Sequence, residues 1–253
     1  MADESLIAVF VDFENLAIGV RDMNKGKFQI DLVLRRLLEK GRIVFKRAYC
    51  DWSNYRDSVR ELHAHGVEMV DIPASKVSGK NSADIHMVAD AIDLSYSKDH
   101  IDTFALISGD SDFSPLASKL KENNKRVIGC GVKSSTSNLL IESCDEFIVY
   151  DDLIRAAEKS KRTRKRPAKT SKKQEAFDRV LEITESLELD HDVVWGSMIK
   201  QAIKRVYPGF NEQYYGHSSF SKLLEAMRKD GLVELRRDDK RGNYAVHLVS
   251  ESS

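Results

Sequence analysis

Short apolar segments alternate with helical patterns through the first 150 residues, and this alternation constrains the fold more than any other feature. Leu6–Val11 reads LIAVFV, a continuous apolar run that is typical of a strand buried in a parallel sheet. The other strand patterns cover Ile43–Tyr49, Val67–Ile72, Thr103–Ser108, Val127–Gly131 and Glu146–Tyr150. The helical patterns cover Asp31–Glu39, with Asp31 as its cap, Ser53–His65, Ser82–Leu94, Ser114–Asn123 and Leu139–Cys144. This order predicts an α/β fold, a parallel sheet sandwiched by helices.

The charge is unevenly distributed, although the 40 Lys and Arg residues balance the 40 Asp and Glu residues. Residues 1–154 hold 19 basic and 25 acidic residues, residues 155–173 hold 10 and 1, and residues 174–253 hold 11 and 14. Lys159–Lys173 contains no acid and one proline, so it cannot bury a core, and we expect a basic flexible linker over 155–173. The chain is therefore divided into a first domain, 1–154, this linker, and a second domain, 174–253.

The second domain has the outline of a small winged helix-turn-helix. Helical patterns over Gln174–Leu187, Trp195–Tyr207 and Ser218–Asp230 precede two strand patterns, Leu232–Arg236 and Tyr244–Val249. The charged turn DDKRGN separates these two strands and suits a hairpin.

Several classes of protein are disfavoured by what the sequence lacks. Its three cysteines, Cys50, Cys130 and Cys144, are odd in number and widely spaced, which argues against disulfides and structural zinc. The start, MADESL, is acidic and does not read as a signal peptide. No apolar run reaches the roughly 20 residues that span a bilayer. We expect a cytoplasmic protein with buried free cysteines and no membrane partner.

Acidic residues follow two of the predicted strands. Asp12 comes directly after the first apolar run, and Asp110 and Asp112 follow the fourth in ISGDSDF. If these two strands are neighbours, the three carboxylates meet at the edge where parallel sheets bind ligands. Asp84, at the start of a helix, is a fourth candidate. Asp90 ranks below it, because it lies about 240° further round that helix.

Clustered carboxylates repel one another unless a cation lies between them. An oxygen-only donor set favours Mg²⁺ or Mn²⁺, which activates water and stabilises charge on a phosphate during in-line displacement. We therefore predict that Asp12, Asp84, Asp110 and Asp112 bind metal and are catalytic. Each acid alone also has an ordinary explanation, as a turn former or a residue of a helix cap.

The first domain resembles the NYN family, also called LabA-like, of the PIN-like nuclease superfamily. The segments that carry the resemblance are VFVDFENL, KNSADIHMVADAIDL and LISGDSDFSPLA. It implies a PIN-like α/β sandwich in which Asp12, Asp84, Asp110 and Asp112 hold divalent metal for RNA phosphodiester hydrolysis. Asn15 and Ser108 also fall on motif positions and are expected to shape the substrate site.

The second domain resembles the LOTUS, or OST-HTH, domain, most recognisably in YPGFNEQYYG and in the run that begins VVWGSMIKQAIKRV. The resemblance implies binding of RNA or of a protein partner. A homodimer is also compatible with the sequence.

Basic and aromatic side chains are candidates for RNA contacts, because an acidic metal site repels a polyanion. Lys80 precedes Asp84, and Lys133 follows the fifth strand. The nine Lys and Arg residues of Lys159–Lys173 suit salt-dependent backbone binding, unless they only solubilise a linker. In the second domain the candidates are Arg236 and Arg237 in the wing, with Lys240, Arg241, His217, Tyr214 and Tyr215, although packing explains the two tyrosines better than stacking does.

The prediction for the whole chain is a metal-dependent ribonuclease with a tethered RNA-binding LOTUS domain. The alternative is a catalytically weak RNA-binding regulator that retains the metal site. A phosphatase or nucleotide-binding Rossmann-like protein is disfavoured, because no GxGxxG or GxxxxGK loop is present.

Overall fold

The computed structural model describes residues 4–23, 26–73, 82–163, 172–238 and 242–249. The chain divides into two compact units, and the change from one to the other falls between Arg162 and Thr163. Each unit has a hydrophobic core of its own.

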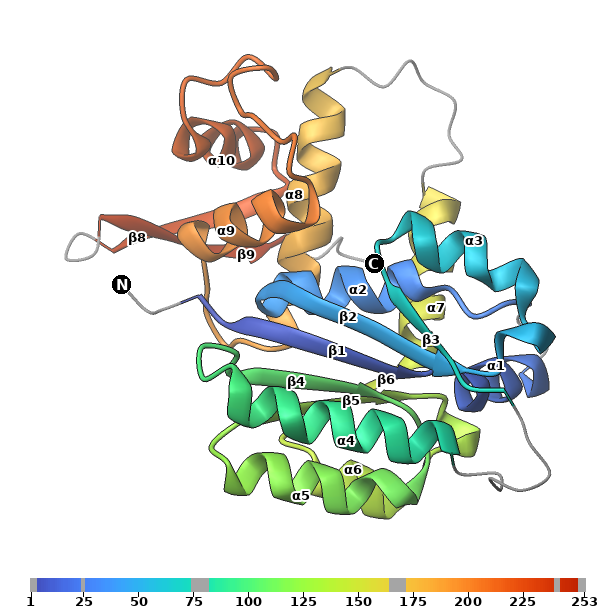
Figure 1. Cartoon of the computed structure of the whole chain (residues 1–253). Coiled ribbons are helices and arrows are strands. Elements are labelled where there is room, and N and C mark those ends of the chain that lie inside the picture. Colours follow the sequence, from blue (N-terminus) through green and yellow to red (C-terminus); the bar gives the residue numbers. More distant parts are fainter. Residues whose placement is uncertain (1–3, 24–25, 74–81, 164–171, 239–241, 250–253) are drawn as a thin grey trace. The chain divides into compact units, whose positions relative to one another are not determined.

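The first unit is built on a six-stranded sheet whose paired strands all run parallel (Figure 1). Its strands are β1 (Leu6–Asp12), β2 (Arg42–Cys50), β3 (Glu68–Asp71), β4 (Thr103–Ile107), β5 (Arg126–Gly131) and β6 (Glu146–Val149). They are ordered β3-β2-β1-β4-β5-β6. The two halves of the unit therefore meet where β1 pairs with β4, the type of switch point at which α/β sheets bind ligands.

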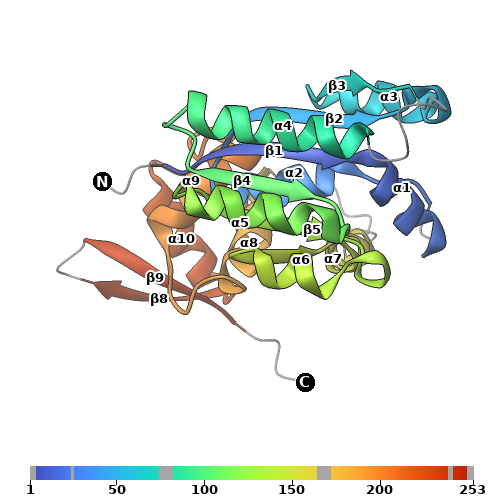
Figure 2. The same ribbon diagram turned by 60° about the horizontal axis from the view of Figure 1, so that its bottom comes forward.

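Helices cover both faces of this sheet, as the alternating pattern predicted (Figures 1 and 2). One face packs against α1 (Phe13–Asp22), α2 (Ile30–Lys40), α3 (Arg56–Ala64) and α7 (Tyr150–Thr163). The other packs against α4 (Ser82–Ser97), α5 (Ser114–Glu122) and α6 (Asn138–Ser143). Strand β1 serves both cores, because Ile7, Val9 and Val11 point to one face and Ala8 and Phe10 to the other.

Among its described residues the first unit also contains three short 3₁₀ turns. They are η1 (Trp52–Asn54), η2 (Ser111–Phe113) and η3 (Lys133–Ser135). The turn η1 and the helix α3 replace the single helix expected over Ser53–His65, because Asp51 caps a separate 3₁₀ turn by accepting a hydrogen bond from the backbone N–H of Ser53.

Three local predictions need correction. The helix α1 was not predicted, although Asp12 both ends β1 and caps this helix. Asp31 lies in the first turn of α2 but is not its cap, since Gln29 holds that position. The helix α7 continues to Thr163, so residues 155–163 are helical where the sequence predicted a flexible linker. Two acids in the first turn of α7 and the buried Ile154 favour this helix.

The second unit contains three helices and a three-stranded antiparallel sheet, which confirms the winged helix-turn-helix (Figure 1). The helices are α8 (Lys172–Glu188), α9 (Gly196–Val206) and α10 (Phe220–Lys229), and the strands are β7 (Val194–Trp195), β8 (Val233–Asp238) and β9 (Asn243–Leu248). Apolar side chains from all three helices and from the strands form one core. The two-residue strand β7 was too short to predict.

The cysteines are free thiols: Cys50 and Cys130 are buried as predicted, whereas Cys144 is only half-buried. Within the described residues, none of the helices combines the length and the apolar character needed to cross a bilayer.

Candidate active site

The central strands β1 and β4 bring two distant sequence motifs to one edge of the sheet. They pair in parallel, with Val11 opposite Ile107. Asp12 and Ser108, the next residue along each segment, therefore reach the same edge, where the arrowheads of β1 and β4 end side by side in Figure 2. The condition on which the predicted cluster of acids depended, that these strands are neighbours, is met.

Ser108 connects the two motifs directly. Its side chain is fully buried, and its Oγ donates a hydrogen bond to Asp12 Oδ2 at 2.7 Å. The same oxygen accepts a hydrogen bond from the backbone N–H of Asp110 at 3.1 Å. The carboxylate of Asp12 and the backbone of Asp110 thus lie on either side of one hydroxyl oxygen.

Asn15 holds the acidic loop against the first turn of α1. Its Oδ1 accepts a hydrogen bond from the backbone N–H of Gly109 at 2.9 Å, and its own backbone N–H donates to Asp12 Oδ1 at 3.4 Å. Within the loop, Asp110 Oδ1 accepts from the backbone N–H of Asp112 at 2.9 Å and so caps the 3₁₀ turn η2. Asn15 and Ser108 therefore position the loop and its acids.

The carboxyl group of Asp12 lies in a setting that opposes its ionisation. The residue is only 7% exposed, and burial is the main reason that its pKa rises from 3.8 to about 7. The negative charges of Asp84 and Asp110 raise this pKa further, while hydrogen bonds from Ser108 and Asn15 partly counter the rise. Asp12 is therefore expected to be only partly ionised near neutral pH when no cation is bound.

Asp84 belongs to the same electrostatic group, although it comes from another helix. It lies half-buried in the first turn of α4, and burial raises its pKa, followed by the charges of Asp110, Asp112 and Glu14. In the part of the chain that the structure describes, none of the four predicted aspartates forms an ion pair with Lys or Arg. Among the described residues, no basic side chain therefore balances the negative charge at this edge of the sheet.

The donor set fits a hard divalent cation, since it consists of carboxylate oxygens with a serine hydroxyl and an amide behind them. Among the described residues, however, no three acidic, histidine or cysteine side chains already form a metal-binding group. The carboxylates do not converge on one point, so binding of Mg²⁺ or Mn²⁺ by Asp12, Asp84, Asp110 and Asp112 would require the side chains other than that of Asp12 to move.

Glu14 is a fifth acid of this edge that the sequence analysis did not select. Its side chain is exposed, and its charge raises the pKa of Asp84 and of Cys50. The signal was available in the motif VFVDFEN, where Glu14 follows Asp12 by two residues. In the structure Glu14 lies in the first turn of the helix α1, which the sequence analysis did not predict, and its charge acts on Asp84.

Comparison with known proteins decides the family of the chain. The profile of the NYN domain matches residues 6–152, and the profile of the OST-HTH/LOTUS domain matches residues 172–244. The chain belongs to the NYN family. Its second unit carries the OST-HTH/LOTUS domain, so both resemblances inferred from sequence motifs are confirmed. NYN domains are typically nucleases, and OST-HTH domains bind RNA.

Two proteins illustrate how far the similarity extends. An uncharacterised protein of Methanocaldococcus jannaschii is 31% identical over 147 residues, which cover 57% of this chain and 55% of that relative. The chain thus spans about half the length of the curated relative it matches. The crystal structure of a protein of unknown function from Vibrio parahaemolyticus aligns with a TM-score of 0.53 and 27% identity, over 60% of this chain and 97% of that one.

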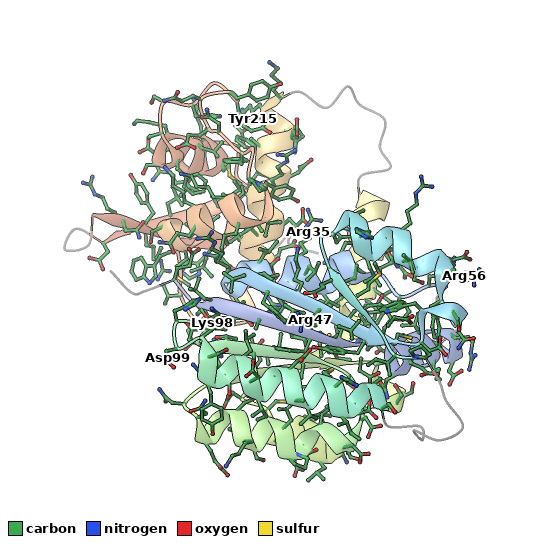
Figure 3. All side chains as sticks on the ribbon, in the orientation of Figure 1. Arg35, Arg47, Arg56, Lys98, Asp99 and Tyr215 are labelled. Atoms are coloured by element: carbon green, nitrogen blue, oxygen red, sulfur yellow. The ribbon has the colours of Figure 1, made fainter. Side chains whose placement is uncertain are left out.

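Asp90 of the NYN domain does not join the acidic edge. Its Oδ2 accepts hydrogen bonds from Arg47 Nη1 and from the hydroxyl of Tyr49, both at 2.7 Å. Arg47, on the face of the sheet that α4 covers, also pairs with Glu68 (Figure 3). Asp90 is thus neutralised by a structural ion pair, which agrees with its lower rank in the sequence analysis.

Lys133 lies on the loop that supports the acidic segment of the NYN domain. It belongs to η3, its side chain is exposed, and its backbone N–H donates to Asp151 Oδ2 at 2.9 Å. The same loop packs so closely on Gly109 that a Cβ there would lie 2.6 Å from the carbonyl oxygen of Ser135. Lys80, the other predicted lysine, lies outside the described residues.

This close approach predicts the effect of Gly109→Ala. The added methyl group must displace the Ser135 backbone, and the hydrogen bond from Gly109 to Asn15 is strained as well. We expect a loss of about 1–3 kcal/mol of unfolding free energy, as for other overpacked sites, measured by denaturant titration. Gly209→Ala is the control, because no atom lies within 4 Å of its Cβ position. Equal stability of the two variants would contradict the prediction.

The OST-HTH domain presents the remaining predicted contacts on its own surface. Arg236 and Arg237 are exposed on β8. Tyr215 is only 9% exposed and packs against Phe210, so the packing explanation holds for it (Figure 3). Tyr214 is 59% exposed, with Lys172 Nζ 4.2 Å from its ring centroid, and remains a candidate for base stacking. Lys240 and Arg241 lie outside the described residues.

Proposed function

We propose that this protein is a metal-dependent ribonuclease that hydrolyses RNA phosphodiester bonds and holds its substrate partly through the OST-HTH domain. One observation carries the proposal: Ser108 joins the carboxylate of Asp12 to the turn that bears Asp110 and Asp112. Asp84 and Glu14 add negative charge to the same edge, and in the described part of the chain no basic side chain neutralises it.

The residues that would hold Mg²⁺ or Mn²⁺ are Asp12, Asp84, Asp110 and Asp112, and a bound ion would polarise the phosphate and lower the pKa of a water nucleophile. Hydrogen bonds within the chain hold part of this site in place. Ser108 and the backbone of Asn15 fix both oxygens of Asp12, so this carboxylate has little freedom to turn. Asp110 and Asp112 lie on a short turn anchored at Ser108, whereas Asp84 approaches from α4.

Proton release from Asp12 is part of the proposal. With its pKa near 7, this carboxyl group keeps a proton over much of the neutral range and must lose it before Oδ1 or Oδ2 can act as an anionic ligand. We therefore expect metal affinity to increase with pH through this range.

RNA must be attracted by other parts of the chain, because residues 1–154 carry more acid than base. The segment 155–173, with 10 basic residues and one acidic residue, is the strongest candidate. Such a segment binds the phosphate backbone without sequence preference and in a salt-dependent way.

The decisive experiment is incubation of the purified protein with single-stranded and structured RNAs in Mn²⁺ or Mg²⁺, with a chelator as control. Cleavage that requires the ion and is lost in Asp110→Asn supports the proposal. Tight RNA binding by the wild type without cleavage of any RNA would instead establish the alternative, a weakly catalytic RNA-binding regulator. The alternative is tested because, among the described residues, no three acidic, histidine or cysteine side chains already form a metal-binding group.

Neutralising the basic segment is predicted to weaken RNA binding. In a variant with Arg164, Lys165, Arg166 and Lys169 replaced by glutamine, up to four phosphate contacts are lost. The slope of log affinity against log salt should then fall in magnitude by up to about 3, since each contact to single-stranded nucleic acid contributes roughly 0.7. Fluorescence anisotropy over a salt series measures this slope. An unchanged slope would show that the segment only solubilises the chain.

A further inference from the structure

The helix α4 carries two acids with different surroundings, Asp84 at the acidic edge and Asp90 six residues further along. Met87, which is fully buried, lies three residues from each of them. At about 100° per residue, the two acids therefore flank the buried face of α4 by about 60° on either side. Asp84 lies on the side of Asp110 and Asp112, whose charges raise its pKa, whereas Asp90 reaches the strand β2.

Asp90 joins α4 to β2 through two hydrogen bonds to one oxygen atom. Its Oδ2 accepts from Arg47 Nη1 and from the hydroxyl of Tyr49, both at 2.7 Å. Tyr49 is only 1% exposed, and Arg47 Nη2 also pairs with Glu68 Oε2 at 2.9 Å (Figure 3). Hydrogen bonds to an ionised carboxylate are short and about twice as strong as neutral ones. Asp90, Arg47 and Tyr49 together form the α4 anchor.

The strand residues of the α4 anchor lie beside the end of β1. The helix α4 packs on both β1 and β2 (Figure 2). In the parallel pairing of these strands, Phe10 is opposite Arg47 and Asp12 is opposite Tyr49. Paired residues of neighbouring strands point to the same face, and Phe10 belongs to the core that α4 covers. Tyr49 thus links the helix that carries Asp84 to the strand position next to Asp12.

We propose that the α4 anchor holds Asp84 beside Asp12, so that both can bind one divalent cation. The apolar packing of α4 is non-directional, so it resists sliding and rotation of the helix less specifically than directed hydrogen bonds do. With the helix fixed, only the side chain of Asp84 has to move to reach the ion. The proposal rests on the metal site of the proposed function but not on RNA cleavage. The anchor residues act through the position of α4 and are positioning residues.

The first test measures the affinity of the full chain for Mn²⁺ by calorimetry, with no RNA present. Tyr49→Phe removes one hydrogen bond of the α4 anchor and leaves every predicted ligand intact. We expect Mn²⁺ to bind about tenfold more weakly, the lower end of the effect of residues that support metal ligands from behind.

The matched control is Tyr150→Phe. Tyr150 is also fully buried, and its hydroxyl accepts a hydrogen bond from the backbone N–H of Gln29 at 2.8 Å, but it belongs to the core on the opposite face of the sheet. This variant loses a hydrogen bond of the same kind without touching α4. It should therefore lose stability and keep the wild-type affinity for Mn²⁺.

Amide hydrogen exchange of the metal-free protein tests the position of α4 directly. In Tyr49→Phe, residues 86–90 should exchange about 2- to 10-fold faster, the effect of one lost hydrogen bond, and residues 116–120 of α5 should change less. Asp90→Ala removes both bonds of the carboxylate and should show the losses in affinity and in protection more strongly. Asp93→Ala, at an exposed position of the same helix, should show neither.

The proposal is overturned if Tyr49→Phe binds Mn²⁺ as tightly as Tyr150→Phe does, or if residues 86–90 of Tyr49→Phe exchange as slowly as in the wild type. Failure of the proposed function gives a different result. Wild-type protein that binds Mn²⁺ more tightly than Tyr49→Phe, yet cleaves no RNA, would contradict the ribonuclease and support the α4 anchor. Wild-type protein that binds no Mn²⁺ would contradict both.

Discussion

Replacing Asp12 with asparagine is expected to reduce RNA cleavage by at least about a hundredfold, the scale on which loss of a central charge-stabilising group acts. The side chain keeps its shape, and its Oδ1 can still accept the hydrogen bond from Ser108. The variant loses the anionic ligand that lies between the two motifs of the site. RNA binding should be unchanged or slightly stronger, because the buried carboxyl group of Asp12 is only partly ionised without the ion, and the variant removes the remaining negative charge.

The control for this variant is Asp93→Asn, which removes an exposed carboxylate from the same NYN domain without touching the acidic edge. It should cleave like the wild type. Cleavage rates are measured with a fluorescent RNA in excess Mn²⁺, and binding is measured with the ion omitted. If Asp12→Asn cleaved RNA at the wild-type rate, Asp12 would have no part in the mechanism, and the proposed arrangement of the active site would be wrong.

The stability of the metal-free NYN domain is expected to decrease as the pH rises from about 4 to about 7. The pKa of Asp12 is near 7 in the folded state against 3.8 for the model group, so the folded protein holds a proton that the unfolded chain releases. The proton on Asp12 therefore stabilises the folded state below about pH 4, and this stabilisation is lost as the pH rises to about 7. The interval corresponds to a free energy on the order of 4 kcal/mol. Asp84, whose pKa is also raised, acts in the same direction.

Divalent ions should reverse this loss, because a cation that binds only the folded state stabilises it and favours ionised carboxylates. Melting temperatures measured by calorimetry should rise more on addition of Mn²⁺ at pH 8 than at pH 5. Asp12→Asn should be more stable than the wild type at pH 8 without metal, and should gain less from Mn²⁺. A larger gain from Mn²⁺ at pH 5 than at pH 8 would contradict the assignment of Asp12 as a ligand.

The fold was largely predictable because a parallel sheet buries its strands on both faces. Central strands such as β1, Leu6–Asp12, therefore appear as apolar runs that no helical period explains. The helices α1 and α7 were not predicted, because the sequence of each fits more than one kind of structure. In α1 the first turn overlaps the motif VFVDFEN, and in α7 the basic composition after Ile154 resembles a linker, although its first turns pack on the sheet.

The candidate site was predictable only in part. Asp12, Asp110 and Asp112 could be selected because they directly follow predicted strands, but their meeting depended on the order of strands, which the sequence did not specify. Glu14 required the helix α1 to be known.

The sequence by itself determined the α/β architecture, the winged helix and the acids worth testing, since periodicity and motif spacing are local properties of the chain. Only the tertiary structure decided that β1 lies beside β4, that Ser108 joins Asp12 to the Asp110 turn, and that Asp90 pairs with Arg47 instead. The physical reason is that a strand pairing, a raised pKa and an ion pair all depend on groups far apart in the chain, whose distances are fixed only when the protein folds.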